Sequence, residues 1–146
     1  MILLVEDNPD DQELTRLAFD RQNFQNELLI VNDGVEAIDY LFGNAANGGP
    51  EPHPLPTVIL LDLKLPRIDG LEVLRRIRAD PRTKTLPVVM LTSSGEEQDV
   101  AASYAQGVNS YIRKPVDFAQ FAEAVRQLGL YWLLMNIAPT PPRSDP

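Results

Sequence analysis

The sequence predicts an α/β fold in which helices cover both faces of one parallel sheet. Three observations predict it: short aliphatic runs recur along the 146-residue chain, amphipathic helix patterns separate them, and turn-forming residues bound each run. Aliphatic runs that do not alternate with polar residues are typical of strands buried on both faces, as in parallel sheets. The expected strands cover residues 2–5, 28–31, 58–61, 88–91 and 110–112.

A helix pattern follows each expected strand. At the first helix, the capping residue Asn8 precedes Pro9 at the first helical position, and acids occupy the first turn. Strands alternating with helices, joined by right-handed crossovers, predict a flavodoxin-like, doubly wound (βα)5 fold with a parallel sheet of order 2-1-3-4-5. The expected helices begin near Asn8, Gly34, Gly70, Gly95 and Asp117.

We expect one domain over residues 1–137, with an extended fifth helix, and a disordered, proline-rich tail at 138–146. The net charge of −8 argues against nucleic acid and anionic membranes as ligands. The absence of cysteine excludes disulfides and thiolate metal sites. No apolar stretch is long enough to span a bilayer, and no basic residue precedes the first apolar run. A cytoplasmic protein is therefore expected.

Acidic residues follow two strands that the predicted topology places side by side. Glu6 and Asp7 come directly after the first strand, and Asp62 follows the third. Ligands of doubly wound sheets lie at the carboxyl ends of the strands, where the strand order reverses, so these carboxylates should meet. Such a cluster is stable if it holds a cation or if its acids stay protonated. Oxygen ligands without His or Cys suit Mg²⁺ or Mn²⁺.

Two further side chains belong to the same edge of the sheet: Thr92 after the fourth strand and Lys114 after the fifth. A metal, an ammonium group and a hydroxyl beside a nucleophilic carboxylate describe a site for a phosphoryl group. Glycine-rich phosphate-binding motifs are absent, and the acids after the first strand would repel a flavin phosphate. An aspartate-nucleophile phosphatase would need a second Asp two residues after the first, but Asn8 and Pro9 follow Asp7.

Four segments resemble the receiver domain of two-component response regulators: VEDN at 5–8, LDLKLPRIDG at 61–70, LTSS at 91–94 and YIRKP at 111–115. The likeness runs from about residue 2 to 128. The loop at 43–56 and the aromatic end of the last helix are similar to small single-domain regulators paired with bacterial phytochromes. The resemblance implies a histidine kinase as partner, of the phytochrome type, and a signalling protein rather than an enzyme.

The resemblance also implies a role for each acid. Asp62 would be the phosphoacceptor, taking the phosphoryl group from a kinase phosphohistidine. Asp7 and Asp62 would bind Mg²⁺ (or Mn²⁺) directly, Glu6 would bind it through water, and Lys64 would contribute its backbone carbonyl. Two rival functions remain open at this point: a pseudo-receiver that only binds a partner, and an Mg²⁺-dependent phosphohydrolase that acts on an external substrate.

The remaining implied roles concern the phosphoryl group and the signal. Thr92 and Lys114 would bind phosphoryl oxygens, and Tyr111 would be the switch aromatic. Pro115 would follow a cis peptide bond, which only an X-Pro bond adopts at low cost. Because no output domain follows, the output is expected on the face formed by the fourth helix, the fifth strand and the fifth helix.

Two groups of charged residues are interpreted as solvent-facing. Asp10 and Asp11 lie in the first turn of the first helix, where acids match the helix dipole. Arg75, Arg76 and Arg78 are expected on the outer face of the third helix.

After Gly129, apolar residues surround the last helix instead of lining one face. Exposed apolar patches usually mark an interface, so a homodimer is expected. The alternative is that the chain turns at Gly129 and packs against its own core. The expected interface residues are Tyr111, Leu130, Tyr131, Trp132, Leu133 and Leu134.

Overall fold

The computed structural model describes residues 1–22, 26–43, 48–49, 51–114 and 117–139. Its five strands form one parallel sheet of order β2-β1-β3-β4-β5, which confirms the predicted topology. The strands are β1 (Ile2–Val5), β2 (Leu28–Val31), β3 (Val58–Leu61), β4 (Val88–Thr92) and β5 (Ser110–Arg113).

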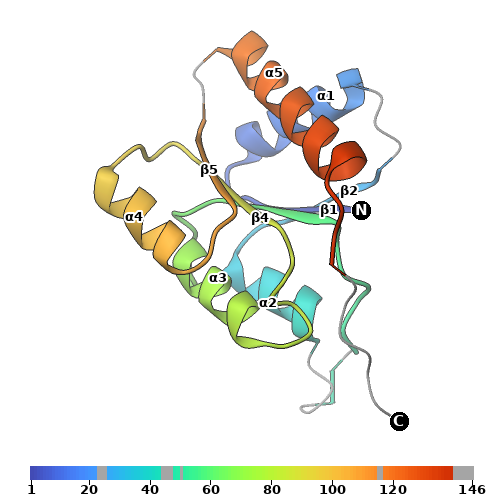
Figure 1. Cartoon of the computed structure of the whole chain (residues 1–146), viewed down its shortest axis with the longest axis vertical. Coiled ribbons are helices and arrows are strands. Elements are labelled where there is room, and N and C mark those ends of the chain that lie inside the picture. Colours follow the sequence, from blue (N-terminus) through green and yellow to red (C-terminus); the bar gives the residue numbers. More distant parts are fainter. Residues whose placement is uncertain (23–25, 44–47, 50, 115–116, 140–146) are drawn as a thin grey trace.

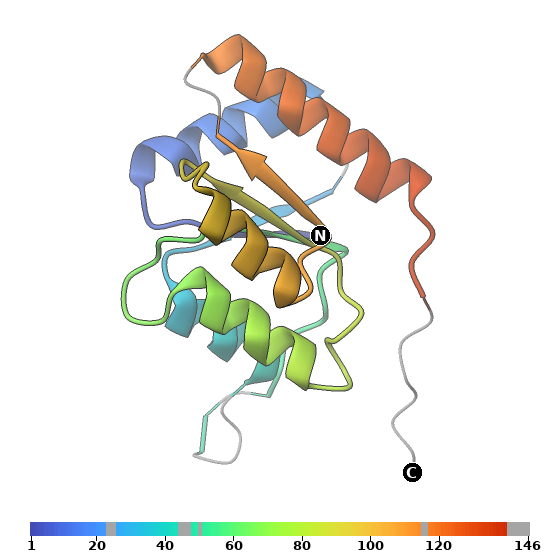
Figure 2. The same cartoon turned by 60° about the vertical axis from the view of Figure 1, so that its left-hand side comes forward.

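The sheet is the middle of three layers. Helices α1 and α5 cover one face, and α2, α3 and α4 lie on the other, as the two views in Figures 1 and 2 show. The helices are α1 (Pro9–Gln22), α2 (Gly34–Phe42), α3 (Gly70–Ala79), α4 (Glu97–Ala105) and α5 (Phe118–Gly129), and α5 continues into the π-helix η2 (Leu130–Met135).

Each face of the sheet carries its own hydrophobic core. In β1, Leu3 and Val5 belong to the core against α2 and α3, whereas Ile2 and Leu4 belong to the core against α1 and α5. Strands β1, β3 and β4 are buried at every position, and the edge strands β2 and β5 are half-buried except at Arg113, which is exposed. The uninterrupted aliphatic runs in the sequence follow from this burial on both faces.

Polar caps fix where most of the helices begin. The side-chain oxygens of Asn8, Asp33, Asp69 and Asp117 accept hydrogen bonds from backbone N–H groups in the first turn that follows. These bonds satisfy donors that have no partner inside the helix. Helix α4 differs, because Glu96 at its N-cap makes no side-chain capping bond among the described residues. The first turn of α4 is instead anchored by the hydrogen bond from Ser94 to Asp99.

The expectation that Arg78 faces solvent is wrong. Its guanidinium group is half-buried, and burial lowers the pKa of Arg78. Periodicity identified a position away from the sheet, but it gave no sign that two loops close over that position. The guanidinium donates to the backbone carbonyls of Lys84, Leu86 and Gly107 and to the side chain of Asn109, at 2.8–3.1 Å.

The helix does not end at Gly129. Gly129 has helical backbone angles, and the chain continues as η2 until Asn136 becomes extended. Trp132 and Leu133 pack against the core between the sheet and α5, whereas Tyr131 and Leu134 are exposed. The apolar segment is thus divided between the protein's own core and its surface. Residues 140–146 of the expected tail lie outside the described part of the chain.

Within the part of the chain that the structure describes, no helix combines the length and apolar character needed to cross a membrane.

Candidate metal and phosphoryl site

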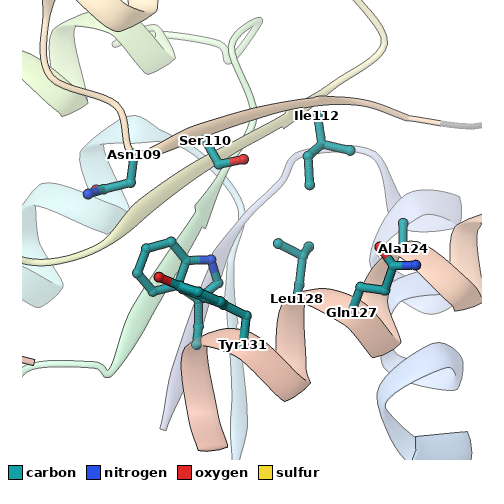
Figure 3. A pocket seen from close by; sticks show the side chains of 8 residues that line it. Asn109, Ser110, Ile112, Ala124, Gln127, Leu128 and Tyr131 are labelled. Carbon is teal, nitrogen blue, oxygen red and sulfur yellow. The ribbon is translucent and has the colours of Figure 1, made fainter. Parts of the chain in front are cut away.

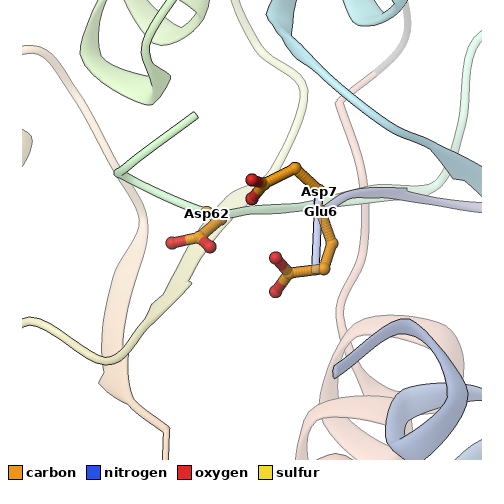
Figure 4. Close-up of side chains that lie close together, drawn as sticks. All are labelled: Glu6, Asp7 and Asp62. Carbon is orange, nitrogen blue, oxygen red and sulfur yellow. The ribbon is translucent and has the colours of Figure 1, made fainter. Parts of the chain in front are cut away.

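Three carboxylates meet at the carboxyl ends of β1 and β3 (Figure 4). The parallel register pairs Val5 with Leu61, so the residues that follow β1 and β3 lie side by side at the same edge of the sheet. One carboxylate oxygen each from Glu6, Asp7 and Asp62 lie within 4.8 Å of one another. Glu6 is 2% and Asp62 8% exposed, whereas Asp7 is open to solvent. The cluster predicted from strand order is therefore present.

Lys114 joins this acidic cluster from β5. Its backbone N–H donates to the carbonyl of Thr92 at 2.7 Å, which extends the β4–β5 pairing by one residue. Its ammonium group donates to Asp11 at 2.8 Å and to Asp62 at 3.4 Å, and it also donates to Glu6. The ammonium group of Lys114 therefore contacts carboxylates that follow β1 and β3 and one carboxylate of α1.

Burial controls the electrostatics of the cluster. It raises the pKa of Glu6 to about 7, where the hydrogen bond from Lys114 opposes the rise and the charge of Asp62 adds to it. For Lys114, burial alone would lower the pKa, but hydrogen bonds to Asp11 and Glu6 and the charge of Asp62 raise it overall. Lys114 therefore keeps its positive charge and offsets part of the negative charge beside Asp62.

The loop after β3 is folded tightly around Asp62. The N–H of Gly70 bonds to the carbonyl of Leu63 at 2.9 Å. A Cβ atom at Gly70 would lie 2.2 Å from the backbone oxygen of Asp62, so glycine allows α3 to begin this close to the acid. Arg67, with a φ of 64°, donates to Asp33 at 2.5 Å and anchors the loop to the start of α2.

The other predicted residues that the structure describes lie on β4, on β5 and in the loop after β3. Thr92 is the last residue of β4 and is fully buried. The half-buried Tyr111 of β5 donates its hydroxyl to the backbone carbonyl of Ser94 at 2.7 Å. The side chain of Lys64 points outward and is 69% exposed. Pro115, with its expected cis peptide bond, lies outside the described residues.

Two acids near the site were missed by the sequence reasoning. Asp11 was interpreted as a surface acid, but it is a partner of Lys114. Asp99 on α4 accepts a hydrogen bond from Ser94 and lies close to Lys64. The position of Asp11 could have been predicted from the topology, because the first turn of a helix that directly follows β1 lies at the same edge of the sheet as the acidic cluster. No feature of the sequence predicted the contacts of Asp99.

A separate groove of about 550 Å³ lies between β5, α5 and η2 (Figure 3). Asn109 and Ser110 line it at the start of β5, and Tyr131 and Trp132 line it from η2. Ile112 lines it further along β5, and none of the three acids of the cluster lines it. Of the expected interface residues, Tyr131 and Leu134 are exposed, Leu130 is half-buried, and Trp132 and Leu133 contact the core.

Comparison with known proteins places this geometry in a family. A family model described as the response regulator receiver domain matches residues 2–126. The probable methanogenesis regulatory protein FilR2 of Methanothrix harundinacea is 40% identical over 141 residues, covering 97% of this chain and 88% of that protein. Response regulator Rcp1 of Synechocystis is 40% identical over 133 residues, covering 91% of this chain and 88% of Rcp1.

Solved structures agree with this assignment. The phosphorylated cyanobacterial phytochrome response regulator RcpA superposes with a TM-score of 0.85 at 40% identity, over 95% of this chain and 97% of RcpA. The Mn²⁺-bound form of Rcp1 gives a TM-score of 0.81 at 37% identity, over 95% of this chain and 98% of Rcp1. The fold, the acidic cluster and these matches lead to one conclusion: the chain belongs to the response regulator receiver domain family.

Proposed function

We propose that this receiver accepts a phosphoryl group on Asp62 from the phosphohistidine of a histidine kinase, in a reaction that depends on Mg²⁺. The observation that carries the proposal is the convergence of Glu6, Asp7 and Lys114 on the largely buried Asp62. A buried carboxylate between two other acids and an ammonium group has the surroundings that phosphoryl transfer requires.

The donor set fits a hard divalent cation. Its ligands are all oxygens, and Mg²⁺ and Mn²⁺ prefer such ligands. Asp7 and Asp62 would bind the ion directly, Glu6 through water, and Lys64 through its backbone carbonyl. A bound ion would neutralise the oxygens of the incoming group. The Mn²⁺-bound structure of Rcp1, a protein similar to this chain, supports this choice of metal.

The proposed transfer is a single exchange of bonds at phosphorus. An oxygen of Asp62 forms the new P–O bond while the P–N bond to the kinase imidazole breaks, and the departing imidazole takes up a proton. Lys114 already contacts Asp62 and would bind one phosphoryl oxygen, and the hydroxyl of Thr92 would bind another. The product is an acyl phosphate on the protein, so the chain acts as a signalling receiver and not on an external substrate.

The signal would leave through the face formed by α4, β5 and α5. Thr92 and Tyr111 are connected through Ser94, whose N–H donates to Thr92 and whose carbonyl accepts from Tyr111. A phosphoryl group that attracts Thr92 would therefore disturb the bond that holds Tyr111. Phosphorylation would shift an equilibrium between two arrangements of this face.

The same proposal includes two partners. The kinase would be a phytochrome, because RcpA is described as a phytochrome response regulator and is 40% identical to this chain. A second copy of the chain would cover the exposed residues of η2, Tyr131 and Leu134, because exposed apolar side chains gathered in one segment favour an interface.

Mass spectrometry of the intact protein tests the function. Wild type incubated with acetyl phosphate and Mg²⁺ should gain one phosphoryl group, and neither Asp62→Asn nor wild type with a chelator should gain it. Binding of beryllium trifluoride, a phosphoryl analogue, covers the case of a short-lived adduct. If wild type neither gains the group nor binds the analogue, the chain is a protein-binding pseudo-receiver. Steady hydrolysis of an added phosphate ester would instead identify an enzyme.

A further inference from the structure

Asp99 on α4 holds together the two loops that flank the phosphoacceptor. Its carboxylate accepts a hydrogen bond from the hydroxyl of Ser94 at 2.6 Å. The same oxygen lies 3.6 Å from the ammonium nitrogen of Lys64. Ser94 belongs to the loop after β4 and Lys64 to the loop after β3. One side chain, only 15% exposed, therefore ties α4 to both loops.

Ser94 makes four hydrogen bonds in the described part of the chain. Its hydroxyl donates to Asp99 and accepts from the N–H of Glu96 at 3.4 Å. Its N–H donates to the hydroxyl oxygen of Thr92 at 3.4 Å, and its carbonyl accepts from the hydroxyl of Tyr111 at 2.7 Å. Ser94 thus connects Asp99 to the residues that the proposed function assigns to the phosphoryl group and to the switch. Hydrogen bonds therefore link Asp99, through Ser94, to both Thr92 and Tyr111.

Helix α4 depends on such ties more than the other helices do. Its N-cap residue, Glu96, makes no side-chain capping bond among the described residues. Of the nine residues of α4, the structure reports only Ser103 as buried. Asp99 lies in the first turn of α4, so its contact with Ser94 anchors the end of the helix that is nearest to the acidic cluster.

We propose that Asp99 is a positioning residue that holds α4, Ser94 and Lys64 in the unphosphorylated arrangement. The proposal rests on the proposed function, because it requires a phosphoryl group on Asp62. That group adds negative charge two residues before Lys64 and attracts the ammonium group away from Asp99. It also attracts Thr92, and with it Ser94. Both contacts of Asp99 are therefore made in the unphosphorylated arrangement and lost in the other.

Contacts made in one arrangement only stabilise that arrangement. Removing Asp99 therefore raises the fraction of molecules that are ready to bind a phosphoryl group. The apparent affinity for a phosphoryl analogue rises in proportion to that fraction. If Asp99 had only a structural role, its removal would lower the affinity for the analogue, because a loosened site binds the analogue more weakly.

Calorimetric titration with beryllium trifluoride at saturating Mg²⁺ tests the proposal. Asp99→Ala should bind the analogue roughly five- to tenfold more tightly than wild type. Glu97→Ala is the matched control, because Glu97 is an exposed acid in the same first turn and its loss changes the helix dipole interaction equally. Glu97→Ala should bind as wild type does.

A second comparison separates positioning from simple charge repulsion. Asp99→Asn keeps an acceptor for Ser94 but loses the charge that attracts Lys64, so its affinity should lie between those of wild type and Asp99→Ala. Repulsion alone would make the two variants equal. Ser94→Ala should also bind more tightly than wild type, and combining it with Asp99→Ala should add less than the sum of the separate effects.

The outcomes are distinct. In one outcome, wild type binds beryllium trifluoride tightly while Asp99→Ala binds it no more tightly than Glu97→Ala does. That result would overturn the positioning role and leave the proposed function intact. Equal affinities of Asp99→Ala and Asp99→Asn, with additive effects of Ser94→Ala, would also overturn it. No Mg²⁺-dependent binding by wild type would overturn both proposals.

Discussion

Lys114 has two opposing effects on the residues around it. Its ammonium group donates to Glu6, Asp11 and Asp62, and so offsets the repulsion among buried carboxylates. The same positive charge lies beside the carboxylates that would bind a divalent cation, and like charges repel. Lys114 therefore stabilises the cluster without a metal and should weaken metal binding.

Replacing Lys114 with Met should reveal this competition. We expect Lys114→Met to bind Mn²⁺ roughly tenfold more tightly than wild type, because a neighbouring positive charge is removed. The same variant should lose most of its phosphorylation by acetyl phosphate, since a group that stabilises the phosphoryl oxygens is gone. Electron paramagnetic resonance of free Mn²⁺ measures the first effect. Lys84→Met, a change at an exposed lysine, is the control, and weaker Mn²⁺ binding by Lys114→Met would contradict the account.

Individual site residues differed in how far the sequence could predict them. Glu6, Asp7 and Asp62 could be placed together because each directly follows a strand, and strand order fixes where strand ends meet. Asp11 and Asp99 lie on helices, where periodicity indicates a face but not which loop that face meets. Lys114 is far from Asp11 in the sequence and Lys64 is far from Asp99, so these two contacts are visible only in the folded chain.

Among the elements, the loop between β3 and α3 is joined to the start of α2 by the ion pair between Arg67 and Asp33. Asp33 caps α2 through the N–H of Glu36 at 2.8 Å and accepts hydrogen bonds from Arg67. The bond from Glu36, and then those from Arg67, lower the pKa of Asp33 from its ordinary value of 3.8. One carboxylate therefore contributes to both the helix and the loop that carries Asp62.

Loss of Asp33 should destabilise the fold in a pH-dependent way. Asp33→Ala should lower the free energy of unfolding by about 1 kcal/mol at pH 7, the usual effect of a lost cap. A lowered pKa contributes stability above pH 3.8, and this is lost as pH falls through the folded-state value. The difference from wild type should therefore narrow in acid, as urea unfolding at several pH values can measure. For Asp33→Asn, which keeps the cap without the charge, a loss as large as that of Asp33→Ala would contradict the capping role.

The ends of the helices differed in how far the sequence could predict them. Helix starts at Asn8, Asp33, Asp69 and Asp117 were predictable, because capping is a local interaction between neighbouring residues. An extension of α5 beyond Gly129 was also expected, but Gly129 alone could not decide it, since glycine is compatible with both a helix end and a helix interior. Packing of Trp132 and Leu133 on the core favours continuation, and that contact is not local.

At the scale of the whole molecule, the two faces of the sheet are covered by different helices, which make different contacts. The face against α1 and α5 continues into η2, where Tyr131 and Leu134 are exposed. On the opposite face, α4 is tied through Asp99 to the loops beside Asp62. The general arrangement follows from alternating strands and helices, so it could be predicted. The contacts that each face makes depend on side chains, so they could not be predicted.

The proposed homodimer makes a prediction at this scale. Leu134→Glu should convert a dimer into a folded monomer, because a charge would be buried in the interface. Leu134 is a better probe than Trp132, whose replacement would also damage the core. Sedimentation velocity measures the mass, and Leu17→Glu, a change at an exposed leucine of α1, should remain a dimer. A wild type that sediments as a monomer would remove the dimer from the account.

The central claim, that Asp62 receives the phosphoryl group, can be tested by chemical trapping. Borohydride reduces an aspartyl phosphate to homoserine and leaves free carboxylates unchanged. After treatment with acetyl phosphate and Mg²⁺, peptide mass spectrometry should find homoserine at position 62 and unmodified Asp7 and Asp11. Homoserine at position 7 or 11 with Asp62 intact would contradict the claim.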